Sequence, residues 1–136
     1  MLFYKIGCYV LILSGLFHLS GHFQELVATN DTERQLFGLM ETYPVNVPGA
    51  TVTMANILDG YSLWFALTLI WSGAMSLFLV KQLGENRAFL LKIAGFNASA
   101  LLIGSGISLL YFFFIPTICL VLGLISFSVA TIQLKR

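Results

Sequence analysis

The chain alternates between long apolar segments and short polar connections. Four segments stay apolar for roughly 20 residues or more, which is the length that an α-helix needs to cross a bilayer. They cover residues 3–23, 57–80, 88–114 and 115–134. Because they occupy most of the chain, the pattern predicts an all-α fold, an integral membrane four-helix bundle. We expect a single transmembrane domain over residues 1–136 and no separate soluble catalytic domain.

The only sizeable polar connection is the segment 24–56, which separates the first two predicted spans. Within it, NDTERQLFGLMETY predicts a short amphipathic helix, because Asn30 is a suitable N-cap and Glu33 follows at the capping-box spacing. Its apolar side chains recur at helical spacing. They are Leu36, Leu39, Met40 and Tyr43. This helix either caps the bundle or lies in the membrane interface. Its acidic character favours capping, and PVNVPG then turns the chain.

Composition supports a membrane location. Hydrophobic residues make up 58% of the chain and charged residues 10%, whereas soluble domains are about 25% charged. The first apolar segment is too long for the hydrophobic region of a usual signal peptide, and no clean cleavage site follows it. We therefore interpret it as a retained helix. The formal net charge of +1 gives no indication of nucleic-acid binding.

The distribution of basic residues predicts the orientation in the membrane. Six of the seven Lys and Arg residues fall at the termini or near the connection between the second and third spans. They are Lys5, Lys81, Arg87, Lys92, Lys135 and Arg136. Arg34 is the only basic residue of the segment 24–56, and the other charged residues of that segment are acidic. Because basic residues concentrate on the cytoplasmic side, we expect both termini in the cytoplasm and the short amphipathic helix outside.

Small and polar residues follow each predicted span at helical spacing. On the first span they are Gly7, Ser14, His18, Gly21, His22 and Glu25; on the second, Asp59, Ser62, Ala66 and Gly73. The third span has two such faces, Gly95, Ser99 and Gly106 on one and Asn97, Ala100, Gly104 and Ser108 on the other. The fourth has Cys119, Gly123, Ser126 and Ala130. Since small residues mark close helix contacts in membranes, the pattern predicts a compact antiparallel bundle with inward-facing histidines.

The end of the first span carries the two histidines of the chain, His18 and His22, and Glu25 follows them. The spacing HxxxHxxE places all three on one helix face, where they could bind a divalent metal or transfer protons. Asp59 enters from the same side on the second span and could approach them. In the simpler interpretation, His22 and Glu25 lie at the interface, while His18 hydrogen-bonds to Ser62 or Asp59 between helices.

Other residues limit the cofactors that the chain can hold. Two histidines on one face of one helix lie about 6 Å apart, so they cannot ligate a haem from both sides, which argues against a cytochrome. Cys8 and Cys119 are expected near opposite membrane faces and form no CxxC motif, which argues against disulfide chemistry. Asn97 is expected to form an interhelical hydrogen bond.

Three stretches carry a resemblance to known sequences. They are GLFHLSGH in the first span, VNVPG at the end of the segment 24–56, and LDGYSLWFALTLIWSG at the start of the second span. Their order resembles that of a group of small uncharacterised bacterial four-helix membrane proteins and, more distantly, that of the DoxX-like proteins. The resemblance implies a four-helix fold in a bacterial inner membrane and transfers no catalytic residue.

These features predict a small accessory membrane protein that binds lipid or another hydrophobic ligand, or that serves as a subunit of a larger membrane complex. The lack of a strong catalytic motif favours a non-enzymatic role. Two alternatives stay open: a membrane-embedded metal-binding protein or enzyme with a site at the outer face, and a homo-oligomeric channel or transporter. The candidate site residues are His18, His22, Glu25, Asp59, Ser62 and Asn97.

Overall fold

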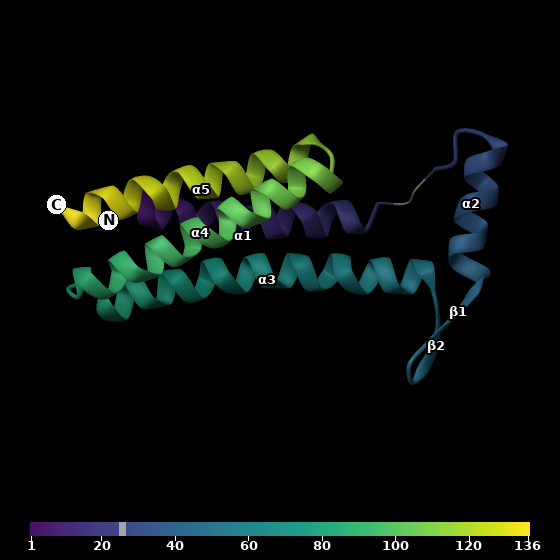
Figure 1. The fold of residues 1–136 in the computed structure, drawn as a ribbon, viewed down its shortest axis with the longest axis horizontal. Helices are drawn as coiled ribbons and strands as arrows, with labels where there is room; N and C mark the ends of the chain where they lie inside the picture. The colour runs from purple at the N-terminus through teal and green to yellow at the C-terminus, as the bar shows by residue number, and fades with distance from the viewer. Residues whose placement is uncertain (25–26) are drawn as a thin grey trace.

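The computed structural model describes residues 1–24 and 27–136. Its elements are α1 (Leu2–His22), α2 (Asp31–Thr42), β1 (Pro44–Val47), β2 (Ala50–Thr53), α3 (Met54–Leu83), α4 (Arg87–Tyr111) and α5 (Phe114–Lys135). The four long helices run lengthwise beside one another, and α2 and the hairpin stand beyond one end of them (Figure 1). Each of these four is long and apolar enough to cross a membrane, as the hydrophobic pattern predicts. Both termini lie at the opposite end (Figure 1).

The helix boundaries differ from the predicted ones mainly at α3. This helix has 30 residues, so it is about 45 Å long and exceeds the roughly 30 Å hydrocarbon core of a bilayer. It begins at Met54, ahead of the predicted start, because the Thr53 hydroxyl accepts a hydrogen bond from the backbone N–H of Asn56 and caps the first turn. At the other corner, α4 ends at Tyr111 and α5 begins at Phe114.

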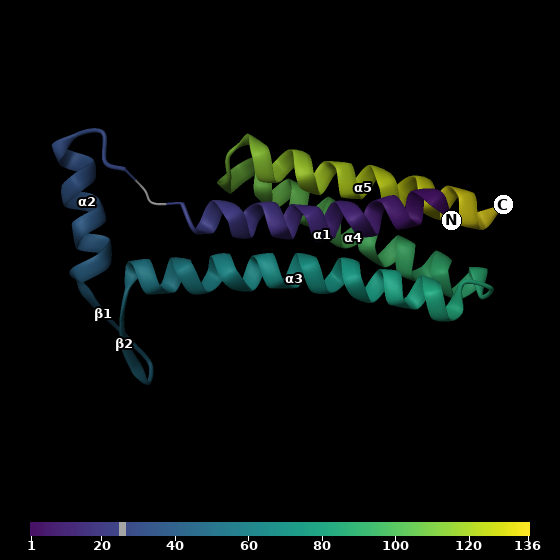
Figure 2. The same cartoon turned by 180° about the vertical axis from the view of Figure 1, so that it is seen from behind.

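α1 lies in the middle of the bundle, between α3 and α5 (Figure 2). Glycines permit its close approach to α3. A Cβ added to Gly73 would lie 2.6 Å from the carbonyl oxygen of Cys8, and one added to Gly15 would lie 2.7 Å from the carbonyl oxygen of Ala66. Both distances are too short for any side chain, so only glycine fits at these two crossings. The packing role predicted for Gly73 is therefore confirmed, whereas Gly15 was not predicted.

The opposite side of α1 packs against α5 through aromatic contacts. Phe127 is fully buried and meets Tyr4 edge to face, with ring centroids 5.4 Å apart and ring planes at 82°. The Phe127 ring also covers Gly7, where an added Cβ would lie 2.8 Å from it. Farther along, Gly123 leaves room for Leu101 of α4. The small residues of α5 therefore face both of its neighbours, α1 and α4.

The predicted compact bundle is wrong for one pair of helices, α3 and α4. A hydrogen bond of 3.2 Å from Asn97 Nδ2 to Ser76 Oγ links them, but they contact each other much less than α4 contacts α5. Farther from their connecting turn, α4 leans toward α5 (Figure 1). The face of α4 that includes Gly104 therefore borders a cavity, and Gly106 has no other described atom within 4 Å of an added Cβ.

Two short antiparallel strands precede α3, and they were not predicted. β1 pairs with β2 along its whole length and ends with Val47 opposite Ala50. Pro48 and Gly49 form the turn, and Gly49 has a φ of 87°, which glycine adopts without strain and which a type II turn requires after proline. The sequence PVNVPG is interpreted only as a turn, because strands of four residues are at the lower limit of length at which an alternating pattern indicates a strand.

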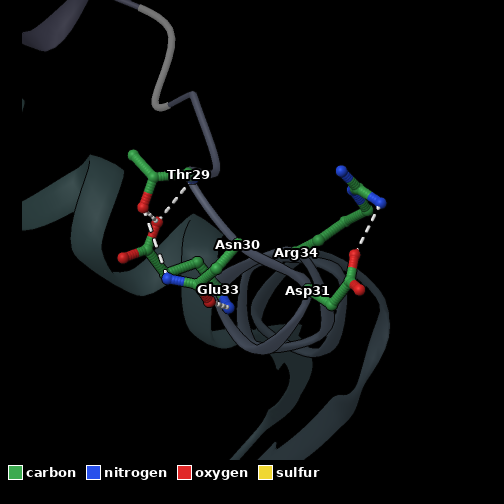
Figure 3. Close-up of polar contacts among 5 residues, drawn as sticks. All are labelled: Thr29, Asn30, Asp31, Glu33 and Arg34. Atoms are coloured by element: carbon green, nitrogen blue, oxygen red, sulfur yellow. Dashed lines mark hydrogen bonds and ion pairs between the residues drawn. The ribbon is translucent and has the colours of Figure 1, made fainter.

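Side-chain hydrogen bonds fix the first turn of α2 (Figure 3). The backbone N–H of Glu33 donates to Asn30 Oδ1 at 2.9 Å, so Asn30 is the N-cap. Glu33 Oε2 in turn accepts hydrogen bonds of 2.7 Å from the backbone N–H and from the hydroxyl of Thr29. The reciprocal bond of the capping box thus goes to the residue before the N-cap. Arg34 and Asp31 add an exposed ion pair at 3.0 Å, which contributes little stability.

Lowering the pH is expected to loosen this turn. The hydrogen bonds from the Thr29 backbone N–H, and then from its hydroxyl, hold the pKa of Glu33 below its usual range. Because the folded pKa is lowered, the stabilisation is fully present above the ordinary Glu value of about 4.3 and is lost as the pH falls through the lowered pKa. The amide proton shift of Thr29, followed by NMR, should titrate with a midpoint below that value.

Two variants control this titration. Glu33→Gln keeps an acceptor oxygen but removes the charge, so it should abolish the pH dependence of the Thr29 shift. Glu41→Gln lies at the other end of α2 and should leave the midpoint in place. A midpoint at or above the ordinary Glu value in the unmodified protein would contradict the assignment of Glu33 as the partner of Thr29.

α2 does not cover the end of the bundle. None of its residues is buried, and the apolar side chains of Leu36, Leu39 and Tyr43 are 52%, 59% and 63% exposed. The helix contacts α3 and β2 and runs across the direction of the long helices (Figure 1). The prediction that this segment caps the bundle is therefore wrong, and a position in the membrane interface stays a prediction.

Candidate functional site

A hydrogen bond joins α1 to α3 near the end of the bundle that faces α2. His18 Nε2 and Ser62 Oγ lie 3.0 Å apart. The imidazole also meets the ring of Phe65 edge to face, with centroids 5.1 Å apart. Ser62 and Phe65 lie about one turn apart on α3, so they hold the His18 ring from two directions. The interhelical bond expected of His18 is thus formed with Ser62.

A cavity of about 380 Å³ lies where the end of α1 meets the start of α5. His18 and His22 both line it, and they occupy successive turns of α1. Gln24, which follows the helix, lines it as well, and α5 contributes Pro116 and Cys119 from its first turns. The structure therefore brings the two histidines to one shared space.

A larger cavity of about 800 Å³ lies between α3 and α4. Its lining is mainly apolar and includes Leu58, Tyr61, Trp64, Ile107 and Phe112. It also includes a few polar side chains, namely Ser62, Thr68, Ser72, Asn97 and Ser108. The space exists because α4 leans away from α3 and because Ala100 and Gly104 present little bulk toward it. A concave apolar space of this size with a few polar groups is typical of a small-molecule site.

The two cavities are neighbours and share part of their lining, which includes His18. The residues that line both of them are His18, Ser62, Phe65, Leu69, Pro116 and Leu120. The hydrogen-bonded pair of His18 and Ser62 therefore stands between a space with polar groups at the end of α1 and a mainly apolar space between α3 and α4.

Asp59 is not part of the cavity lining that includes the histidines. It lies about one turn before Ser62 on α3, is exposed, and lines neither cavity. Among the described residues, no hydrogen bond or ion pair links Asp59 to His18 or His22. An approach of Asp59 to the histidines therefore stays a prediction.

The predicted metal site includes Glu25, which lies outside the described residues. Within the part of the chain that the structure describes, no group of three or more His, Cys, Asp or Glu side chains is placed to hold a metal ion. His18 and His22 alone supply two imidazoles. A divalent metal bound by His18, His22 and Glu25 therefore stays a prediction.

Asn97 plays the structural part expected of it and lines the larger cavity as well. Its Nδ2 donates to the buried Ser76 Oγ, which ties α4 to α3 on the side of the cavity nearer their connecting turn. Ser108 forms a second buried polar contact, since its hydroxyl lies 2.7 Å from the Thr117 hydroxyl of α5. These bonds fix the two ends of the α4 wall.

Several lining residues were not predicted from the sequence. They are Gln24, Phe65, Leu69, Pro116 and Leu120. Most are ordinary apolar residues of a membrane span, so their chemistry gives no indication of a site. The pattern that could have pointed to the cavity is the pair Ala100 and Gly104, but small residues predict close packing just as readily.

Comparison with known proteins adds no relative. No known protein family, no curated protein and no solved structure matches this chain. The resemblance to small bacterial four-helix and DoxX-like proteins therefore stays a prediction, and the cavities and their lining are the features that bear on function.

Proposed function

We propose that this is a small integral membrane protein that binds a hydrophobic, chain-bearing ligand of the lipid class and acts as an accessory component of its membrane. The observation that carries the proposal is the 800 Å³ cavity between α3 and α4. Its volume lies within the range of about 300–1,000 Å³ that is typical of ligand sites. An apolar chain in a concave apolar space of this size gains dispersion contacts with the lining on several sides, which favours a chain-like occupant.

The exposure of the lining supports entry of the ligand from the bilayer. Trp64 is 68% exposed and Ile107 is 50% exposed, although both line the larger cavity. The cavity therefore opens sideways between α3 and α4, on the flank of helices that are long and apolar enough to span a membrane. A lipid-class ligand would enter it without passing through water.

The orientation that we propose follows from charge. Both termini share one end of the bundle with the turn between α3 and α4 (Figure 1), and Lys81, Arg87 and Arg136 belong to that end. Basic residues favour the cytoplasmic side, so we propose cytoplasmic termini in a bacterial inner membrane. In that orientation the two histidines lie toward the outer face, and α2 and the hairpin lie outside.

Filling the larger cavity is expected to block the ligand. Gly104 lines that cavity, and a Cβ added there would meet only Leu120, at an ordinary contact distance of 3.9 Å. Gly104→Leu should therefore fold and place its side chain in the cavity. A fatty acid brominated in the middle of its chain, added to the protein in detergent, should quench Trp64 fluorescence in a Trp71→Phe background. We expect the fatty acid to bind Gly104→Leu at least tenfold more weakly than it binds the unmodified protein. The added leucine side chain would occupy the space that the acyl chain of the fatty acid fills.

Gly106→Leu is the matched control. It makes the same change two residues later on α4, at a position with no other described atom within 4 Å of an added Cβ. It should therefore keep the affinity of the unmodified chain for the brominated fatty acid. Equal affinity in Gly104→Leu and Gly106→Leu would mean that the probe binds elsewhere, and the proposed function would fail.

A further inference from the structure

We propose that the smaller cavity is the head-group subsite of the same ligand, and that it takes an uncharged head with hydroxyl or carbonyl groups. This inference rests on the proposed function, because it assumes that the chain of the ligand occupies the larger cavity. The two cavities are neighbours, because they have six lining residues in common, His18 and Ser62 among them. We therefore place the chain of a single amphiphile between α3 and α4 and its head beside the end of α1.

Some polar groups of the smaller cavity already donate a hydrogen bond within the protein, and others have atoms that can still bond to a ligand. The hydroxyl of Ser14 donates to the Val10 carbonyl at 2.6 Å, and that of Ser20 donates to the Phe17 carbonyl at 2.8 Å. Both hydroxyls therefore donate their hydrogen bond to a backbone carbonyl of their own helix, as serine in a membrane helix commonly does. They can accept a hydrogen bond from a ligand but have no proton left to donate.

The free groups come from three positions at the end of α1. His18 uses Nε2 for Ser62, which leaves its Nδ1. His22 and Gln24 line the same cavity, and neither side chain forms a hydrogen bond to another described residue. A neutral imidazole and a carboxamide each offer a donor and an acceptor. Together they match a head that both donates and accepts, such as a glycerol hydroxyl next to an ester carbonyl.

Charge complementarity selects an uncharged head. Among the described residues that line the two cavities, none is Lys, Arg, Asp or Glu. A phosphate or carboxylate beside these residues would find no lysine or arginine as a partner for a charge-assisted hydrogen bond, whereas a hydroxyl or carbonyl group finds neutral donors and acceptors. The lining therefore favours a neutral amphiphile over a charged one with the same chain.

A pair of probes with identical chains tests this subsite. One is a monoglyceride and the other is the free fatty acid, both brominated in the middle of the chain, measured by quenching of Trp64 in the Trp71→Phe background. At about pH 9 the free acid is ionised in solution. We expect the monoglyceride to bind the Trp71→Phe protein, whose cavity residues are unchanged, at least tenfold more tightly than the fatty acid does.

Variants of the free polar groups separate the subsite from the chain site. The double variant His22→Leu and Gln24→Leu should weaken monoglyceride binding by about three- to tenfold, the loss expected for one or two hydrogen bonds, and should leave fatty-acid binding unchanged. Gln82→Leu, an exposed glutamine near the other end of α3, is the control and should change neither affinity.

The outcomes distinguish the two proposals. If Gly104→Leu blocks both probes but the double variant leaves the monoglyceride unaffected, the head-group subsite is overturned and the chain site stands. If the fatty acid binds as tightly as the monoglyceride, the preference for an uncharged head is overturned. If Gly104→Leu blocks neither probe, the proposed function itself fails.

Discussion

Replacing Phe127 by alanine is expected to destabilise the protein by about 3–5 kcal/mol, the range for removing a fully buried aromatic ring. The ring is fully buried, packs edge to face on Tyr4 and covers Gly7. The glycine cannot fill the space that is left, and the surrounding helices are held by other contacts, so a cavity remains between α1 and α5. Unfolding in mixed detergent and SDS micelles, followed by circular dichroism, measures the free energy of unfolding.

Phe114→Ala is the matched control for this prediction. It removes the same side chain from the same helix, but Phe114 is 75% exposed, so the ring has few protein neighbours to lose. We expect a change within about 0.5 kcal/mol, as for surface positions. A similar loss for both variants would mean that α5 does not pack on α1 through Phe127.

Gly73→Ala is expected to lower the free energy of unfolding by about 1–3 kcal/mol or more, the range for overpacking a close contact. The added Cβ would lie 2.6 Å from the carbonyl oxygen of Cys8. That atom belongs to the backbone of α1, so it cannot rotate away as a side chain would, and the two helices have to separate. Since His18 and Ser62 are joined across the same pair of helices, we also expect weaker binding of the brominated monoglyceride.

Gly60→Ala makes the same change on the same helix and should have the opposite effect. An added Cβ at Gly60 has no other described atom within 4 Å, so nothing opposes it. Alanine is a better helix former than glycine by up to about 1 kcal/mol, and we expect a small stabilisation in the same unfolding assay. A loss of stability in Gly60→Ala comparable to that in Gly73→Ala would contradict a specific contact between α1 and α3.

The spans and their order could be predicted from the sequence because they depend on local properties. A run of about 20 apolar residues suffices for a membrane-length helix, whatever its neighbours are. The cap at Asn30 is local in the same sense, since its partner Glu33 is three residues away. The shared helix face of His18 and His22 follows from helical spacing alone. The hairpin was not predicted because each of its strands has only four residues, the lower limit at which an alternating pattern indicates a strand.

The cavities could not be predicted, because they depend on how far apart two helices lie. Gly73, Gly104 and Gly106 all occur at helical spacing in apolar segments and are indistinguishable as sequence features. In the structure, Gly73 contacts the backbone of α1, Gly104 borders the larger cavity, and Gly106 is exposed. The difference arises because α4 packs on α5 and leans away from α3.

The sequence by itself therefore determined the four apolar helices, the cap of α2 and the placement of both histidines on one face, because each depends on residues within a few turns of one another. The tertiary structure decided that His18 meets Ser62 and that His18 lines two neighbouring cavities. These features depend on helix lengths and on which helices touch. Those quantities are set by packing between different helices, such as the contact of His18 with Ser62, 44 positions away, and no local pattern encodes them.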